Sequence, residues 1–342
     1  MKTPFVRIAP LVALLLAGAG CVGPTQPRVP EPHRPKVVAY VPNWNDLAAF
    51  APTIDYGKVT HLNIAFENPT NDDGEFSFRA HDAALIAAAH AHGVKVLLSI
   101  GGGSAAEDRV LKPRYHLLMS APRRAAFAAK LAAYVQTHGF DGLDVDLEGP
   151  SINADYGPFV VELAAALRRD GKLITAALSQ GYGGGNVPAA ALAAFDFVNV
   201  MAYDATGSWA PNRPGQHSSM EFARTNIAYW RKRGVPNERL VLGVPFYGHA
   251  FGPAAAQRGH GYKNIVARFP GAEQRDQSGE TIWYNGIPTI RAKAQLVRDE
   301  GLAGVMIWSL DNDSSGEKSL LAAIDSVLRP ALAAKKLTPT TP

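Results

Sequence analysis

Residues 123–148 read RRAAFAAKLAAYVQTHGFDGLDVDLE, and this stretch decides the fold. Its first part, Arg123–His138, is an alanine-rich segment of helical character, and its later part, Gly142–Leu147, is a β-like run. Gly139 lies between them, and glycine readily takes the left-handed conformation that ends a helix and turns the chain back toward a sheet. The stretch therefore predicts one helix followed directly by one strand.

Short β-like runs recur from residue 36 to residue 328 and alternate with helical segments. We identify eight such runs: Val37–Val41, His61–Phe66, Val94–Ile100, Gly142–Leu147, Leu173–Leu178, Phe197–Tyr203, Leu240–Phe246 and Gly304–Trp308. Alternation of strand and helix is typical of parallel β/α units. Eight units in this span predict an α/β protein with a (β/α)8 TIM barrel, a fold that usually takes ~250 residues.

The helical segments support the same fold class. They are Asp82–His92, Arg123–His138, Tyr156–Arg169, Met220–Arg233, Ile290–Glu300 and Leu320–Leu328. Capping glycines follow the helical runs at Gly93, Gly139, Gly171, Gly234 and Gly301. An open doubly wound sheet is the alternative, but it would need a phosphate-binding loop after an early strand, and residues 101–104 (GGGS) lack the dinucleotide-binding spacing.

The seventh β/α unit is longer than the others. An insertion at about residues 249–288 is too long for a plain loop. It carries the aromatic residues Phe251, Tyr262, Phe269, Trp283 and Tyr284. We expect it to form a small subdomain over the mouth of the barrel.

Composition excludes several classes of protein. The chain has 342 residues, of which 47% are hydrophobic and 19% charged, which is enough apolar material for a large core and excludes global disorder. The net charge is +4, and no dense basic run lies outside the C-terminal tail, so we expect no nucleic acid partner. With Cys21 as the single cysteine, no intrachain disulfide or CxxC metal site can form.

The N-terminal residues 1–21 have the order of a secretory signal. Lys2 and Arg7 are positive, Leu11–Leu16 is apolar, and small residues follow. The apolar run, even together with its flanking residues, is too short to span a membrane. The segment resembles a bacterial lipoprotein signal, in which the cysteine, here Cys21, is lipidated and becomes the mature N-terminus. An ordinary cleaved signal is the alternative, since Gly18 stands where lipoprotein signals prefer leucine.

Three further segments complete the predicted organisation. Residues 22–35 are rich in proline and predict an extended linker, as a tether from a membrane surface requires. The catalytic barrel is expected at 36–328, and a loose tail at 329–342. We expect an extracytoplasmic protein: a lipoprotein attached to the cell envelope through Cys21, or otherwise a secreted or periplasmic protein.

A ladder of carboxyl groups marks the fourth predicted strand. Alternate residues of a strand face the same side, so Asp144, Asp146 and Glu148 point together into the barrel, while the leucines and valine between them pack outward. The ladder rises toward the C-terminal rim, where barrel enzymes carry out their chemistry. Burial and proximity disfavour three negative charges, so a proton is shared and a carboxyl pKa is raised, as a general acid requires. We expect Glu148, nearest the rim, to be that acid.

Three other interpretations of the ladder remain open. The strict alternation with apolar residues argues against a solvated acidic edge strand. Carboxylates suit hard divalent cations, but barrel metal sites draw ligands from several strands, and no strand-end His or Asp completes an obvious set, so we expect neither metal nor cofactor. A purely structural polar network is the third interpretation.

Five motifs together resemble one known family. Asp-x-x-Asp-x-Asp-x-Glu at Asp141–Glu148 resembles the signature of family 18 glycoside hydrolases, the chitinase family. The family's Ser-x-Gly-Gly, Met-x-Tyr-Asp, seventh-strand and eighth-strand tryptophan motifs are matched by Ser99–Gly102, Met201–Asp204, Pro245–Gly248 and Trp308. The matches occur in order between about Val37 and Leu310.

The resemblance implies a specific reaction on β-1,4-linked N-acetylglucosamine polymers, chitin or chito-oligosaccharides. Glu148 would protonate the leaving oxygen while the substrate's own acetamido oxygen attacks the anomeric carbon, giving an oxazolinium ion that water opens with retention. Asp146 would hydrogen-bond the acetamido N–H, and Asp144 would share a proton with Asp146. Tyr203 would donate its hydroxyl to the acetamido oxygen.

The resemblance also implies a set of substrate-binding residues. They are Trp308, Tyr247, Asp204, Met201, Tyr40, Phe66, Ser99 and Gly102. The family places Ser99 below the aspartates as a hydrogen-bond partner. For Tyr40, Phe66 and Trp44, core packing is as good an interpretation as sugar contact.

Two departures from the family leave the substrate open. Gly103-Ser104 stand where many chitinases have tryptophan, and His249 stands where many have arginine. In the family, both positions help to hold leaving-group sugars. The short insertion suggests an open groove and an enzyme that cuts bonds within the polymer chain. An endo-β-N-acetylglucosaminidase acting on N-glycan chitobiose cores is the close alternative. A non-catalytic chitin-binding lectin is the second, although its relatives usually lack one of the acidic residues that are all present here.

Overall fold

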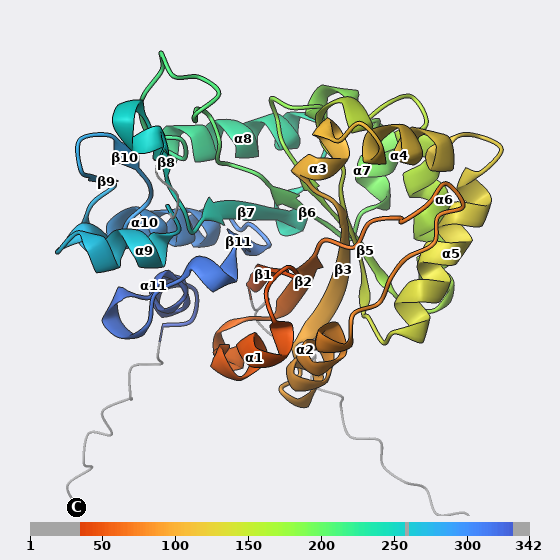
Figure 1. Ribbon diagram of the computed structural model, residues 1–342, viewed down its shortest axis with the longest axis horizontal. Helices are drawn as coiled ribbons and strands as arrows, with labels where there is room; N and C mark the ends of the chain where they lie inside the picture. Colours follow the sequence, from red (N-terminus) through yellow and green to blue (C-terminus); the bar gives the residue numbers. More distant parts are fainter. Residues whose placement is uncertain (1–34, 257–259, 331–342) are drawn as a thin grey trace, which may run out of the picture. The chain divides into compact units, whose positions relative to one another are not determined.

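Eight parallel strands close into a barrel in the computed structural model, which describes residues 35–256 and 260–330 (Figure 1). The strands are β1 (Lys36–Pro42), β2 (His61–Ala65), β3 (Lys95–Gly101), β4 (Gly142–Asp146), β5 (Leu173–Leu178), β6 (Phe197–Val200), β7 (Leu240–Pro245) and β11 (Gly304–Trp308). Strand β1 pairs with both β2 and β11, which closes the barrel. The predicted (β/α)8 TIM barrel is therefore confirmed. The predicted signal, Cys21 and most of the linker and tail lie outside the described residues.

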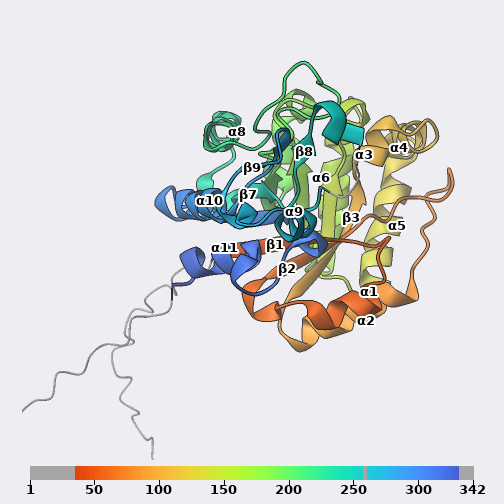
Figure 2. The same ribbon diagram turned by 60° about the vertical axis from the view of Figure 1, so that its left-hand side comes forward.

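Helices surround the barrel (Figures 1 and 2). Those that follow the predicted segments are α2 (Ala80–Ala91), α5 (Arg124–Thr137), α6 (Tyr156–Arg169), α8 (Met220–Lys232), α10 (Ile287–Asp299) and α11 (Leu320–Leu328). Helices α5 and α6 lie next to each other, as do α10 and α11. The five predicted capping glycines all have φ values between 61° and 87°.

Further short helices were absent from the sequence prediction. They are α1 (Leu47–Phe50), α3 (Gly103–Glu107), α4 (Leu111–Met119), α7 (Ala189–Ala194) and α9 (Tyr262–Arg268). None has more than nine residues. A helix this short shows too few turns for its hydrophobic period to be recognised.

Strand β6 is shorter than predicted. It ends at Val200 rather than Tyr203, because the Ala202 amide bonds back to the Val200 carbonyl oxygen at 2.8 Å and bends the chain out of the ladder. Met201 and Tyr203 still belong to the apolar cluster inside the barrel. The bend thus keeps both side chains in the interior after the strand has ended.

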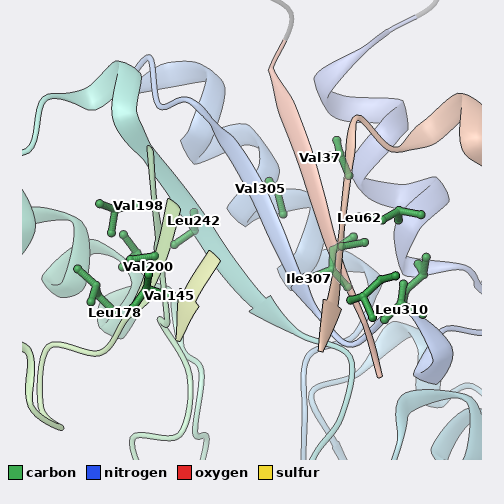
Figure 3. Close-up of a cluster of buried hydrophobic side chains, with 14 of the residues drawn as sticks. Val37, Leu62, Val145, Leu178, Val198, Val200, Leu242, Val305, Ile307 and Leu310 are labelled. Carbon is green, nitrogen blue, oxygen red and sulfur yellow. The ribbon is translucent and has the colours of Figure 1, made fainter. Parts of the chain in front are cut away.

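Two apolar layers hold the barrel. Figure 3 shows part of the larger one, in which outward-facing strand residues such as Val37, Val145 and Leu242 pack with the helices. The smaller cluster fills the interior and includes Val38, with Trp308 packed against it. The predicted alternation of β4 is thereby confirmed: Leu143, Val145 and Leu147 belong to the outer layer.

The segment between β7 and α10 forms a small unit of its own. Strands β8 (His249–Ala250), β10 (Ile282–Trp283) and β9 (Gln277–Ser278) make an antiparallel sheet in that order, and α9 lies between β8 and β9 in sequence. This segment corresponds to the insertion predicted at about 249–288. Within the described residues, no helix has the length and apolar character needed to cross a membrane.

Candidate active site

Asp144 is the fully buried base of the ladder. Its Oδ2 accepts hydrogen bonds from the Tyr40 hydroxyl at 2.6 Å and from Ser99 Oγ at 2.8 Å. Its Oδ1 accepts from Thr175 Oγ1 at 2.6 Å and Asn199 Nδ2 at 3.2 Å. Burial raises the pKa of Asp144, and these four donors oppose that rise because they stabilise the carboxylate.

Asp146 has the opposite environment. It is buried, and its Oδ1 has no hydrogen-bond partner among the residues that the structure describes. Burial raises the pKa of Asp146 well above its usual range, and the charges of Glu148 and Asp144 raise it further. The carboxyl group between the two other acids is therefore the one that holds a proton most readily.

Glu148 continues the ladder beyond the end of β4. Its backbone is extended, with φ −123° and ψ 162°, so the alternation of the strand is preserved as far as the rim. Burial, together with the charges of Asp204 and Glu107, raises the pKa of Glu148 to about 7. A carboxyl group with such a pKa can hold a proton near neutral pH and donate it, as a general acid must.

Tyr203 places a hydroxyl group beside the ladder. The ring is almost completely buried, and the hydroxyl donates to a weak acceptor, the Met306 sulfur at 3.9 Å. Burial and the charge of Asp146 keep the pKa of Tyr203 well above its usual range, so the group stays protonated. Its O–H therefore remains available to a ligand.

Trp308 ends β11 and forms an aromatic floor. Its ring lies 5.5 Å from Phe66 at an interplanar angle of 22°, and 5.5 Å from Tyr40 in an edge arrangement. Gly102 makes room for this packing, because a Cβ at that position would lie 2.5 Å from the Phe66 ring. Trp308 itself stays partly exposed.

Several predicted substrate-binding residues have a different role. Tyr40 is buried and donates to Asp144, so it supports the ladder instead of offering its face to a sugar. Ser99 lies beside Asp144 on the neighbouring strand and donates to it, which matches the hydrogen-bond role that the family resemblance implies but not a place below both aspartates. Gly102 admits Phe66, as described above, and Trp44 is 64% exposed rather than part of the core.

Three side chains meet Asp204 at the rim. Its Oδ1 lies 2.8 Å from His249 Nε2 and 3.3 Å from His217 Nδ1, and it also accepts from the Tyr247 hydroxyl. Burial would raise the pKa of Asp204, but these hydrogen bonds lower it well below its usual range. Asp204 is the only residue other than glycine with positive φ in the described part of the chain, at 62°. Its backbone is strained where the side chain meets the site.

A pocket of about 900 Å³ opens at the end of the ladder. Its lining includes Glu148, Met201, Tyr203 and Asp204, together with the aromatic residues Tyr182 and Trp209. Tyr182 is 43% exposed and Trp209 59% exposed. Exposed aromatic faces in a concave site suit the apolar C–H faces of sugar rings.

The sequence analysis missed several residues of the site. Thr175 and Asn199 face inward from β5 and β6, and the alternation rule applied to the ladder could have found them as polar residues in apolar strands. Tyr182, Trp209 and His217 lie on irregular segments, where no period indicates which way a side chain points.

Comparisons with known proteins agree with this geometry. The sequence profile of glycosyl hydrolases family 18 matches residues 36–313. The crystal structure of the family 18 chitinase ChiB from the chitin utilization locus of Flavobacterium johnsoniae is similar with a TM-score of 0.81 and 37% identity, over 87% of this chain and 94% of that one.

Two curated proteins illustrate the range of relatives. A chitinase-like effector of Moniliophthora perniciosa is 31% identical over 73% of this chain and 68% of its own length. Probable chitinase 10 of Drosophila melanogaster is 28% identical over 81% of this chain, which spans only 15% of that longer protein. Together with the profile match, these similarities show that the chain belongs to the glycosyl hydrolases family 18 and is a glycosidase.

Proposed function

We propose that the protein hydrolyses β-1,4 bonds of N-acetylglucosamine polymers, chitin or chito-oligosaccharides, by a retaining mechanism in which the substrate supplies the nucleophile. One observation carries the proposal: Asp146 is buried without a hydrogen-bond partner for Oδ1, between a fully bonded Asp144 and a Glu148 at the rim. A buried carboxyl group that favours its proton is a poor nucleophile. It is well suited to bind a polar group of the substrate.

The residues support a two-step reaction. In the first step the acetamido oxygen attacks the anomeric carbon, the bond to the bridging oxygen breaks, and Glu148 gives its proton to that oxygen. The Tyr203 hydroxyl holds the acetamido oxygen, and Asp146 accepts the acetamido N–H. In the second step water adds to the anomeric carbon of the oxazolinium ion, the bond from that carbon to the acetamido oxygen breaks, and the water gives a proton to Glu148, which regenerates the acid. Holding the internal nucleophile in place can lower the barrier by ~7–11 kcal/mol at best.

The proposed mechanism limits the substrate to sugars that carry an acetamido group next to the anomeric carbon. Trp308 offers the partly exposed floor for that sugar, and the pocket beyond Glu148 offers Tyr182 and Trp209 to the leaving-group sugars. The same set would serve an enzyme that cuts the chitobiose core of N-glycans. The polymer is therefore to be found by giving the protein both substrates.

Glu148→Gln tests the acid role directly. We expect the variant to lose hydrolysis of a chito-oligosaccharide by at least about 100-fold, since general acid catalysis contributes 10²–10⁴-fold, while calorimetry shows oligosaccharide binding close to that of the wild type. Glu238→Gln is the matched control and should remain fully active. Glu238 directly precedes β7 and so lies at the end of that strand away from the rim. Unchanged turnover in Glu148→Gln would contradict the proposal.

The nucleophile is tested separately from the acid. Proton NMR of the first product should show the β-anomer, and a thiazoline that mimics the oxazolinium ion should inhibit. Rapid turnover with an inverted product, or without any response to the thiazoline, would contradict substrate assistance. Binding of chito-oligosaccharides without turnover by the wild type would point to the lectin alternative, and release of glycans from an N-glycoprotein alone would identify the endo-β-N-acetylglucosaminidase.

A further inference from the structure

Asp204, His217 and His249 bring three potential metal ligands together at the rim of the pocket. One ligand atom from each lies within 4.8 Å of the others. We propose that these three side chains form a binding site for a divalent transition-metal ion, with Zn²⁺ as the best-suited ion. The site is distinct from the acidic ladder, although Asp204 is also one of the predicted substrate-binding residues.

The donor set favours Zn²⁺ over hard cations. Two imidazoles and one carboxylate are ligands that zinc binds well, whereas Ca²⁺ and Mg²⁺ need mostly oxygen. Zinc bonds of 2.0–2.2 Å in a tetrahedron separate neighbouring ligand atoms by roughly 3.4 Å. The separations of Asp204 Oδ1 from His217 Nδ1 and His249 Nε2 are 3.3 Å and 2.8 Å, so small side-chain shifts admit the ion.

His217 is a preorganised ligand. It is fully buried, and its Nδ1 lies 3.3 Å from Asp204 Oδ1 and accepts a long hydrogen bond of 3.4 Å from the Asp204 amide, so this nitrogen presents its lone pair toward Asp204. The next residue, Ser218, is fixed from two sides: its hydroxyl donates to the Ala202 carbonyl oxygen at 2.6 Å, and its own carbonyl oxygen accepts from Lys293 Nζ at 2.7 Å. The backbone that carries the imidazole therefore cannot move far.

Outer contacts complete the site. The Tyr247 hydroxyl donates to Asp204 and can keep this bond as the carboxylate binds a metal, which is the usual second-shell arrangement. His249 comes from β8 of the inserted segment, and its ring packs edge-on against Trp209 at 5.0 Å. The side chain of Asp204 is 42% exposed and lines the pocket, so an ion can enter and keep a solvent molecule as its fourth ligand.

The position of the site means that a bound ion would affect hydrolysis. Asp204 lines the same pocket as Glu148, on the path of the leaving-group sugars, so bound Zn²⁺ would compete with substrate and inhibit reversibly. This consequence rests on the proposed function, whereas the metal site itself does not.

Zinc binding is measured on the full chain by calorimetry and by competition with a chromogenic chelator. The chain carries Cys21→Ser and no polyhistidine tag, so that neither a thiol nor a tag binds the ion. We expect one Zn²⁺ per chain, with the affinity reduced at least about tenfold in His249→Gln and in His217→Gln, because even outer-shell changes cost 10–100-fold. His90→Gln is the matched control: His90 lies 2.8 Å from Asp141, but no third ligand joins them within the described residues, and its loss should leave the affinity unchanged.

The outcomes separate the two proposals. Absence of stoichiometric binding, or equal affinity in both site variants and the wild type, would overturn the metal site. If His217→Gln does not fold, His249→Gln still tests the site, because His249 is partly exposed. Binding of Zn²⁺ without inhibition of oligosaccharide hydrolysis would overturn only the competitive role. A zinc-free protein that binds the ion but never hydrolyses chito-oligosaccharides would contradict the proposed function and leave the metal site supported.

Discussion

The three carboxyl groups of one strand have three different environments. Asp144 accepts four hydrogen bonds, Asp146 Oδ1 accepts none from the described residues, and Glu148 meets the pocket. Different environments separate the proton affinities of otherwise similar groups, and this separation assigns acid and base roles. Because the groups interact, the protons belong to the set as a whole. Changes at single residues therefore test the site most sharply through pH.

The first residue-scale prediction concerns the pH profile. Glu148 must carry a proton to act as the acid, and its pKa is raised to about 7, so kcat/KM should fall as the pH rises through about 7. The charge of Glu107 contributes to that raised pKa. Glu107→Gln should therefore move the alkaline limb to lower pH, while Glu238→Gln, a matched exposed glutamate far from the rim, should not. An alkaline limb that stays in place in Glu107→Gln would contradict this electrostatic coupling.

The second residue-scale prediction concerns stability. The folded state holds a proton on Glu148 up to about pH 7, whereas the unfolded chain releases it near its ordinary pKa of 4.5. The folded state thus binds more protons between these values, and this stabilising contribution is lost as pH rises through 7. Glu148→Gln removes the penalty of the buried charge. It should raise the free energy of unfolding at pH 8 by about 1–3 kcal/mol, discounted for partial exposure, but not at pH 4.5.

Urea unfolding at the two pH values measures this difference. Glu238→Gln is the control, because Glu238 is exposed and far from the rim and should show little change at either pH. A Glu148→Gln variant less stable than the wild type at pH 8 would mean that the carboxylate is better accommodated in the fold than its burial suggests.

At the scale of elements, the loop after β5 packs directly on the residue that follows Glu148. The Gly149 amide donates to the Tyr182 carbonyl oxygen at 3.2 Å, and a Cβ at residue 149 would lie 2.2 Å from the Tyr182 ring. Gly149 also has φ 49°, a conformation that side chains disfavour. The position of the acid therefore depends on contact between two loops.

Gly149→Ala should disturb this contact. We expect a loss of about 1–3 kcal/mol in unfolding free energy and a decrease in kcat of about 10-fold or more, because small displacements of a catalytic group are costly. Gly185→Ala is the matched control, because Gly185 lies in the loop of Tyr182 but a Cβ there would face open space. Tyr182→Ala combined with Gly149→Ala should recover part of the stability. Strictly additive effects in this double-mutant cycle would contradict the contact.

Elements with a clear period or a helical composition were predictable, and those with neither were not. Strand β4 and helices α5 and α6 follow from alternation, helical composition and the glycines that separate them. The short helix α4 contains Pro113 and shows little periodicity, so the sequence did not indicate it.

Within the site, alternation predicted that Asp144 faces inward. The partners of its carboxylate, however, depend on the register of β4 with β3 and β5, which pairs Asp144 with Ser99 and Thr175. The cluster at Asp204 depends on two loops whose course no local pattern determines.

On the scale of the whole molecule, the barrel gathers side chains from distant parts of the sequence at one rim. The ladder comes from β4, the aromatic floor from β11, and His249 from the inserted segment. Such an arrangement explains why motifs spread from Ser99 to Trp308 identify one site. The N-terminal residues 1–34 lie outside the described region.

We propose that those N-terminal residues attach the enzyme to the cell envelope through lipid on Cys21. The proposal rests on a charged start, a short apolar run and small residues before the cysteine, with the proline-rich residues 22–35 as spacer.

Expressed in a bacterium, the full chain should partition into the detergent phase of a Triton X-114 extract. Cys21→Ala should move it to the aqueous phase, and Lys2→Gln, which retains the cysteine, is the control. Because the residues of the proposed site all lie within the described barrel, turnover of soluble oligosaccharides should stay unchanged in Cys21→Ala. Mass spectrometry of the mature N-terminus decides the matter: an unmodified chain that begins after a different residue would show an ordinary secretory signal instead.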